Sequence, residues 1–383
     1  MQWGAFVLSN RVVVAINRLS SRQFYLFLCA LALVVYGVRG FGFPESVQGD
    51  DLDLYFHAVN RVAATTGFVQ FDTFGFFDPY NGYLIVLLRV FTKIAMLGND
   101  TNFTTHAFLL MTPLFAVTMA GIGAVVARVT SRFIALLALT FLVFLPFSNL
   151  VILAQINTVA WPLALAMIVI AATRTYPQTL FGKVGLAIVF SLTTLSSGTM
   201  LIAIALLGLG IIEGLKRINR YEIALFLIGG ISFFIQWMSY TSRTNPKLPI
   251  AGELYKAMFH FSPQYLRTKV NQPLFAEDHI VLWIIPAMLF IIWVVFAIET
   301  AKVDRHLVIS AIKLLGAGFM LLALLIRGNG WFNTHYLFIP VSMFWISLAL
   351  VYHGSRHHVS SRFALAIASV LFAVSYSGTY YLL

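Results

Sequence analysis

Three carboxylates lie within four residues, just after the first long apolar segment, in Gly49-Asp50-Asp51-Leu52-Asp53. The chain has only 14 acidic residues in 383, so this is a marked local concentration. Ionisable groups are costly at or near membrane depth, and they favour a functional site there, with a solvated loop that has no function as the alternative. A carboxylate in such a place suits general-base chemistry, in which it removes a proton from a hydroxyl group within hydrogen-bonding reach.

Helical geometry separates the three aspartates. If residues 50–61 form a helix, a turn of about 100° per residue puts Asp50, Asp53 and His57 on one stripe, while Asp51 points elsewhere. One of Asp50 and Asp51 is then expected to cap the helix by accepting bonds from free backbone amides. The other is the candidate base, and the spacing leaves open which one it is. His57 is interpreted as an orienting or surface residue.

Two further polar stretches accompany this cluster. Asp78-Pro79-Tyr80-Asn81-Gly82 combines two turn-forming pairs, so Asp78 is interpreted first as a turn former, with a functional role as the alternative. Asn157 and Trp161, near Gln155, suit a sugar by hydrogen bonding and ring stacking, and they equally suit an ordinary interfacial turn.

Basic residues on the same side of the predicted membrane supply the complementary charge. Arg89 and Lys93 lie four apart in an apolar run over 84–97 and share one face of a predicted interfacial or re-entrant helix. Arg327 ends a span and opens a polar hinge that reaches His335. Two or three such cations at one point would bind a phosphate, and the alternative is attraction to anionic lipid headgroups. The basic residues concerned are Arg89, Lys93, Arg243, Lys247, Lys256, Arg267, Lys269 and Arg327.

The composition excludes a soluble globular domain: 60% of residues are hydrophobic, 10% are charged, and the mean hydropathy is +0.87. We predict an all-α polytopic membrane protein, a single integral membrane domain over 1–383, with about eleven transmembrane helices (about nine to thirteen). The apolar segments are 24–43, 107–127, 133–153, 159–173, 184–197, 199–214, 222–240, 280–298, 307–326, 333–352 and 363–382. The three segments between 159 and 214 are short, so they are expected to be tilted, broken or partly buried.

The distribution of charge predicts the orientation. A cytoplasmic N-terminus puts 14 of the 25 basic residues on the cytoplasmic side, nearly all of them in tight turns, so the net charge of +11 reflects the positive-inside bias rather than nucleic-acid binding. Two large loops, 44–106 and 241–279, are then extracytoplasmic, and the first is expected to carry interfacial helices as well as the acidic cluster. Cys29 is the single cysteine and offers neither an intramolecular disulfide nor metal-ligand spacing.

This layout resembles the GT-C superfamily of membrane glycosyltransferases. The resemblance rests on four stretches: Asp50-Asp51, Asp78 to Leu84 with Arg89, the turn from Asn157 to Trp161, and His335-Tyr336 at the start of a late span. Bacterial members often have Arg-Tyr at the last position, and the His-Tyr of this chain departs from that pattern, which weakens the assignment of phosphate binding to His335. The sequence has no phosphate loop and no dinucleotide fingerprint.

The resemblance implies an inverting enzyme that takes a sugar from a polyprenyl-phosphate donor and transfers it on the extracytoplasmic face of a bacterial inner membrane. Asp51 or Asp50 would be the base, and Arg89, Arg327, His335, Lys247 and Arg267 would bind the donor phosphate. Acceptor or sugar contacts would come from Asp53, His57, Asp78, Tyr80, Asn157 and Trp161. The acceptor would be a polysaccharide, a lipid-linked glycan or a protein, the other partners would be membrane lipids, and no nucleic acid is expected.

No cofactor is required by this chemistry. Some relatives use a divalent cation, however, and Asp50 and Asp51 would share it if one binds. The alternative function is a polytopic transporter or a flippase for lipid-linked glycan precursors, which Lys313 and the short segments favour. A third is an acyl- or phosphotransferase that would recruit His57 and His335.

Overall fold

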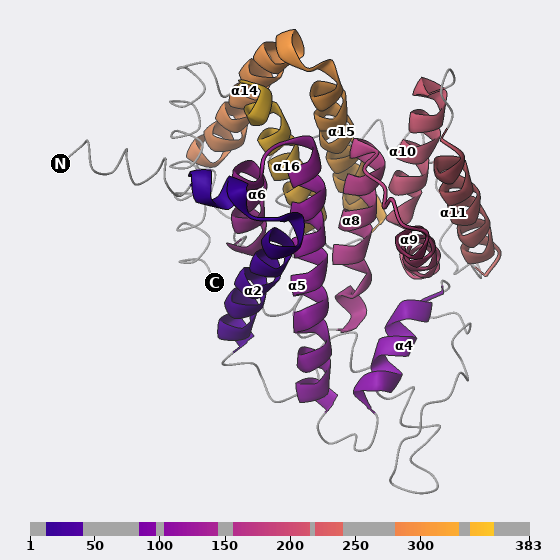
Figure 1. The fold of residues 1–383 in the computed structure, drawn as a ribbon. Coiled ribbons are helices and arrows are strands. Elements are labelled where there is room, and N and C mark those ends of the chain that lie inside the picture. The colour runs from indigo at the N-terminus through magenta and orange to yellow at the C-terminus, as the bar shows by residue number, and fades with distance from the viewer. Residues whose placement is uncertain are drawn as a thin grey trace, which may run out of the picture. The chain divides into compact units, whose positions relative to one another are not determined.

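The computed structural model describes residues 13–40, 84–96, 103–144, 156–214, 219–239, 280–328 and 338–355. Within these ranges every regular element is a helix (Figure 1). The helices are α2 (Ser21–Gly40), α4 (Val86–Ala95), α5 (Phe103–Val129), α6 (Arg132–Phe144), the 3-10 turn η2 (Ile156–Thr158), α8 (Ala160–Thr173), α9 (Leu180–Thr194), α10 (Met200–Glu213), α11 (Arg220–Met238), α14 (Ile280–Val303), α15 (Arg305–Gly328) and α16 (Phe338–Ser355).

Each predicted apolar segment that has described residues contains a helix, with bounds that differ by a few residues, and the last segment, 363–382, lies outside the described residues. By length and composition, three helices in the described ranges can cross a membrane: Thr105–Val129 within α5, α11 and α16. Shorter apolar helices accompany them. The chain is therefore a helical protein with membrane-helix character, and the predicted number of crossings stays a prediction.

The short segments between 159 and 214 are confirmed as short helices. α8, α9 and α10 contain 14, 15 and 14 residues. At 1.5 Å per residue each is about 21–23 Å long, less than the hydrocarbon thickness of about 30 Å. Most of α8 is buried, as expected for a helix surrounded by protein.

The chain forms two compact units. Unit 1 comprises Met1–Leu26, Gly123–Ser148 and Lys247–Leu383, and unit 2 comprises Phe27–Ile122 and Asn149–Pro246. In unit 1, α16 packs against α6, α14 and α15. The Ser347 hydroxyl on α16 accepts a hydrogen bond from the Trp293 indole on α14 at 2.8 Å and donates one to the Ala311 carbonyl on α15 at 2.7 Å. The buried Ser347 side chain thus links α14, α15 and α16 by hydrogen bonds, in addition to their apolar packing.

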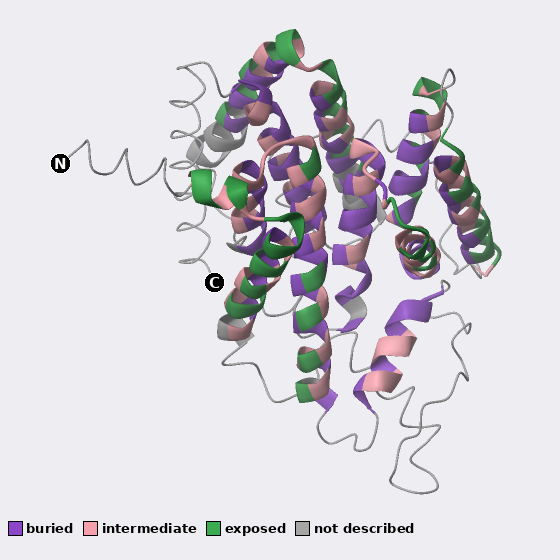
Figure 2. Ribbon diagram, in the orientation of Figure 1, coloured by how far each residue is buried: buried purple, intermediate pink, exposed green. Residues whose placement is uncertain are grey.

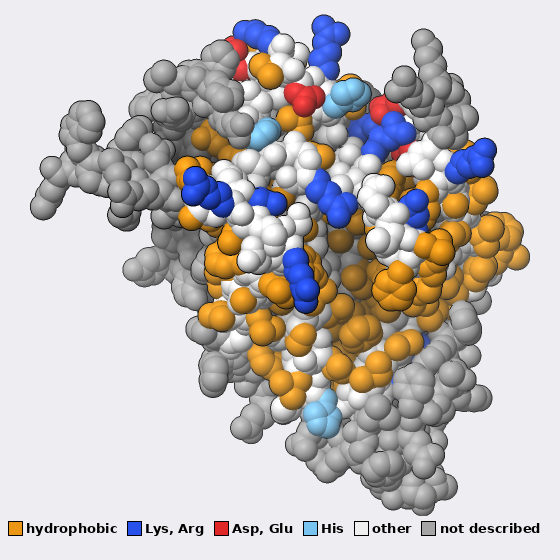
Figure 3. Space-filling model, in the orientation of Figure 1, with side chains coloured by type: hydrophobic (Ala, Val, Ile, Leu, Met, Phe, Trp, Pro, Cys, Tyr) orange, Lys and Arg blue, Asp and Glu red, His pale blue; other side chains and the backbone are white. Residues whose placement is uncertain are grey.

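In unit 2, α10 packs against α8 and α11, and α11 packs against α9. The hydroxyls of Ser191 on α9 and Ser232 on α11 lie 2.8 Å apart and share a hydrogen bond. Figure 2 shows α11 buried along one side and exposed along the other, whereas α9 is buried only near its C-terminal end. The exposed sides are apolar, with Phe181 89% and Ile231 62% exposed, and Figure 3 shows apolar side chains gathered over them. Such a surface fits lipid better than water.

Two adjacent glycines on α11 differ in surroundings, and they give a test of this packing. A methyl group at Gly229 would overlap the Phe190 ring and lie 2.9 Å from Ile204 Cγ1, whereas one at Gly230 would meet open space. We expect Gly229→Ala to lower the free energy of unfolding by about 1–3 kcal/mol through overpacking. Gly230→Ala is the matched control and should raise it by about 0.5–1 kcal/mol through helix propensity. Thermal unfolding in detergent measures both, and equal effects would contradict the packing.

Candidate functional site

Helix α4 carries the one predicted phosphate-binding residue whose side chain is described, Arg89. The helix has ten residues and is about 15 Å long, too short to cross a membrane, as predicted. Arg89 and Lys93 are both half-buried and lie one turn apart. Val86, Leu87, Leu88, Thr92 and Ala95 are buried. Because half of the helix is buried in protein, α4 fits a re-entrant element better than one lying on the membrane surface.

The chain enters α4 through two hydrogen bonds to one side chain of α11. The Leu84 N–H donates to Gln236 Oε1 at 2.9 Å, and Gln236 Nε2 donates to the Leu84 carbonyl at 3.1 Å. Both residues are buried, and 152 positions separate them in the sequence. A side-chain amide satisfies a backbone donor and acceptor together, as a neighbouring strand would.

A second contact secures the first turn of α4. The Leu87 N–H donates to Ser196 Oγ at 2.8 Å, just after the end of α9, and the same hydroxyl donates to the Leu192 carbonyl at 2.8 Å. Leu84, Val86 and Leu195 form a buried apolar cluster around these bonds. Polar and apolar contacts therefore fix the start of α4 on the end of α9.

The other end of α4 is also held. His106 Nδ1 lies 2.8 Å from the Ala95 carbonyl, and because a carbonyl only accepts, this nitrogen carries the proton. The Met96 N–H donates to the Thr92 carbonyl at 3.0 Å and closes the helix. Both ends of the Arg89 helix are thus bonded to other segments of unit 2.

The turn predicted to contact a sugar lies beside this helix. η2 contacts α4, Asn157 is its central residue, and Trp161 lies in the first turn of α8 with its side chain half-buried. Only the backbone of Asn157 is described. The structure therefore brings the Arg89 helix and the 157–161 turn, which are distant in sequence, into one region of unit 2. Buried hydroxyl groups belong to the same region: Thr158, Thr193, Thr194, Ser196 and Ser197.

Most of the other predicted site residues lie outside the described residues. These are Asp50, Asp51, Asp53, His57, Asp78, Tyr80, Lys247, Arg267 and His335. Arg327 is the penultimate residue of α15, in unit 1, and only its backbone is described. The predicted acidic cluster, and its predicted helix, therefore remain predictions.

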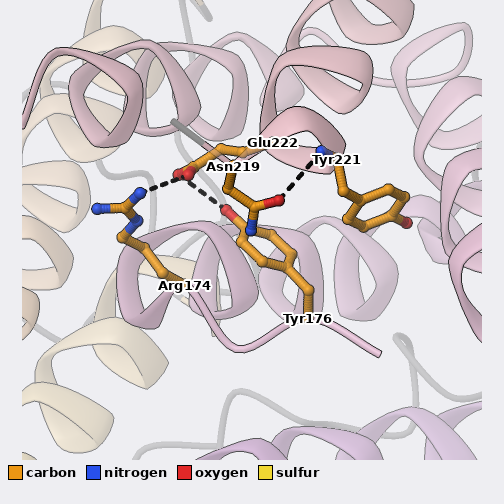
Figure 4. A network of polar contacts seen from close by, with 5 residues as sticks. All are labelled: Arg174, Tyr176, Asn219, Tyr221 and Glu222. Carbon is orange, nitrogen blue, oxygen red and sulfur yellow. Dashed lines mark hydrogen bonds and ion pairs between the residues drawn. The ribbon is translucent and has the colours of Figure 1, made fainter. Parts of the chain in front are cut away.

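A second polar network, at the other end of α11, was not singled out from the sequence (Figure 4). Glu222 is fully buried and accepts hydrogen bonds from the Arg174 guanidinium at 2.6 Å and from the Tyr176 hydroxyl at 3.0 Å. The Asn219 side chain caps α11 by accepting from the Tyr221 N–H at 3.0 Å. The sequence signal for this network was an acidic residue near the start of an apolar helix. Its partners lie 46 and 48 positions away in the sequence, so no local pattern pointed to them.

This network is suited to holding helices together. Both Glu222 oxygens are engaged, so the carboxylate is not a free base. Arg174 ends α8 in the left-handed conformation, with φ 54°, which turns its side chain toward Glu222. Gly210 on α10 leaves room for the carboxylate, because any side chain there would overlap Glu222 Oε1. Burial, and then the Glu222 charge, raise the pKa of Tyr176 above its ordinary range, so its hydroxyl stays protonated and donates.

The α4 region offers cations and hydroxyls, which suit an anionic or sugar-bearing ligand. Within the described ranges, no group of three or more His, Cys, Asp or Glu residues is placed to hold a metal ion. No family model matches this chain, and no curated protein matches it at a significant level.

The buried Glu222 predicts a specific loss of stability. Glu222→Gln should lower the free energy of unfolding by about 2–3 kcal/mol, less than the roughly 3–5 kcal/mol of a fully buried pair, because the Arg174 side chain is 33% exposed. The exposed Glu213 on α10 gives the control, and Glu213→Gln should change stability by less than about 0.5 kcal/mol. Thermal unfolding in detergent measures both. Equal stability of the two variants would show that the ion pair contributes nothing.

Proposed function

We propose that this protein is a GT-C type glycosyltransferase of a bacterial inner membrane. It transfers a sugar from a polyprenyl-phosphate donor to a cell-envelope acceptor on the extracytoplasmic face, with inversion. The observation that carries the proposal is the anchored α4: this helix carries the half-buried Arg89, contacts the 156–158 turn, and belongs to the same predicted loop, 44–106, as Asp50 and Asp51.

The basic residues near one end of α11 support the proposed orientation of the protein in the membrane. Gln236, which holds α4, follows Glu222 by 14 positions on one helix, so the two polar regions are about 21 Å apart. Arg174, Lys183 and Arg220 belong to the Glu222 end. By the positive-inside bias that end is cytoplasmic, which makes the α4 end extracytoplasmic. About eleven crossings, as predicted from the apolar segments, agree with this orientation.

The reaction is a single displacement. Asp51 or Asp50 removes the proton of the acceptor hydroxyl, and the acceptor oxygen then attacks the anomeric carbon from the face opposite the phosphate. The bond from the anomeric carbon to the phosphate oxygen breaks, and polyprenyl phosphate leaves with the electron pair. Arg89 stabilises the negative charge on this leaving phosphate. The step needs no cofactor, and a divalent cation held by Asp50 and Asp51 would serve the same leaving group.

The second candidate is a transporter or a flippase for lipid-linked glycan precursors. The short helices α8, α9 and α10, with buried hydroxyls where α9 ends, favour it. An internally repeated transporter would have matching short helices in its other half. In unit 1 the described helices α14 and α15 have 24 residues each and do not match, and α6, with 13 described residues, is a single short helix.

The aspartates provide the first test. Asp50→Asn and Asp51→Asn should both fold, and at least one should abolish sugar transfer from a polyprenyl-phosphate-linked hexose, because the base is lost. Transfer to an envelope glycan fraction is measured with the purified protein in liposomes, and size-exclusion profiles check folding. Full activity of the double variant would refute the assignment, and translocation of the donor without transfer would favour the flippase.

Arg89 provides the second test. Arg89→Ala should reduce the rate of transfer by about 100-fold through lost stabilisation of the leaving phosphate. Arg89→Lys should recover part of it, since it keeps the charge but loses the planar fork. Lys302, an exposed residue of α14 in unit 1, gives the control: Lys302→Gln should leave the rate unchanged. An unchanged rate in Arg89→Ala would remove Arg89 from the site.

A further inference from the structure

We propose that Gln236 and Ser196 are positioning residues that set the place of α4, and through it the place of Arg89. The placement of α4 follows from the geometry alone. Its consequence for catalysis rests on the proposed function.

The start of α4 lacks a cap of its own. The residue at the N-cap position is Ile85, whose apolar side chain makes no capping hydrogen bond. The first amides of a helix have no partner within the helix, and in a buried place each needs one from elsewhere. Ser196 meets this need from the end of α9: its hydroxyl accepts the Leu87 N–H.

The Ser196 hydroxyl is itself fixed in direction. It donates to the Leu192 carbonyl in the last turn of α9, so its lone pairs point toward Leu87. The cap of α4 therefore moves with α9. A residue without a hydroxyl at 196 would leave a buried backbone N–H unsatisfied.

Gln236 fixes the residue that precedes the helix. A primary amide offers a donor and an acceptor in one plane without charge, and Gln236 uses both on Leu84. Ser196 comes from α9 and Gln236 from α11, and these two helices are joined to each other by the Ser191–Ser232 hydrogen bond. The two anchoring groups thus reach the start of α4 from two helices that pack against each other.

Arg89 follows Leu87 by two positions, within the same first turn of the helix. Its own N–H donates to the Ile85 carbonyl at 3.0 Å, so its backbone is bonded directly to the anchored segment. A shift of the Leu84–Leu87 backbone is therefore transmitted to Arg89. Misplacement of a catalytic group by about 1 Å can cost about 100-fold in rate.

The test reads the position of α4 independently of any reaction. Cys29 is the single cysteine, so Cys29→Ser gives a cysteine-free background, and Ile94→Cys puts a reporter thiol on the half-buried side of α4. We measure the rate at which a membrane-impermeant maleimide modifies this thiol in proteoliposomes. Gln236→Met and Ser196→Ala should each raise that rate about tenfold, because the lost bonds favour local opening of α4.

Two variants separate positioning from general destabilisation. Ser196→Thr keeps the hydroxyl and should return the labelling rate to within about twofold of the parent. Ser232→Ala removes a buried hydroxyl from the same helix as Gln236, but one bonded to Ser191 rather than to α4, and should leave the rate unchanged. Should Gln236→Met fail to fold, Gln236→Glu keeps the acceptor for the Leu84 N–H and should give an intermediate rate. Unchanged labelling in the Gln236 and Ser196 variants, or an equal rise in Ser232→Ala, would overturn the inference.

Sugar transfer is measured in the same set of variants with Ile94 and Cys29 restored. If the proposed function is correct, Gln236→Met and Ser196→Ala lower kcat more than they raise KM, because Arg89 acts on the leaving group in the transition state. Faster labelling with unchanged transfer would support the placement of α4 and would refute the role of Arg89. A failure of the proposed α4 placement and a failure of the proposed function therefore give different experimental results.

Discussion

The pair of hydrogen bonds between the Gln236 side chain and the Leu84 backbone is the constraint on which the candidate site depends. A backbone segment buried in an apolar surrounding must satisfy both its N–H and its carbonyl, because each unsatisfied group costs a few kcal/mol. Leu84 is not yet helical, and the part of the chain that the structure describes contains no strand to pair with it. Gln236 substitutes for the missing strand, and this allows the chain to enter unit 2 at that point and to start α4 there.

The two polar regions of unit 2 solve the same problem in different ways. At one end of α11, a carboxylate is buried with a guanidinium and a phenol as partners, and a glycine leaves it room. At the other end, an uncharged amide and a hydroxyl satisfy backbone groups. A buried ion pair fixes the ends of α8 and α11 to each other, whereas the neutral pair holds a helix that presents cations. The neutral anchors add no charge of their own beside Arg89.

Much of the helical arrangement could be predicted from the sequence, because apolar segments and their lengths are local properties. The predicted short segments are the short helices α8, α9 and α10, and the shared face of Arg89 and Lys93 follows from their spacing of four in α4. The anchors could not be predicted in this way. Gln236 is a single amide in an apolar run, and nothing in its periodicity points to Leu84, 152 positions away. The same holds for Glu222 and its partner Arg174.

The sequence by itself determined that the chain is helical and apolar, that α4 is too short to cross a membrane, and that it carries two cations on one face. These follow from composition and from the geometry of one helix. Only the tertiary structure decided which polar groups meet: that Ser196 caps α4, that Gln236 holds its entry, and that Glu222 is bound in an ion pair rather than free. The physical reason is that a buried polar group takes the partner that packing brings within about 3 Å, and packing joins residues that no local pattern relates.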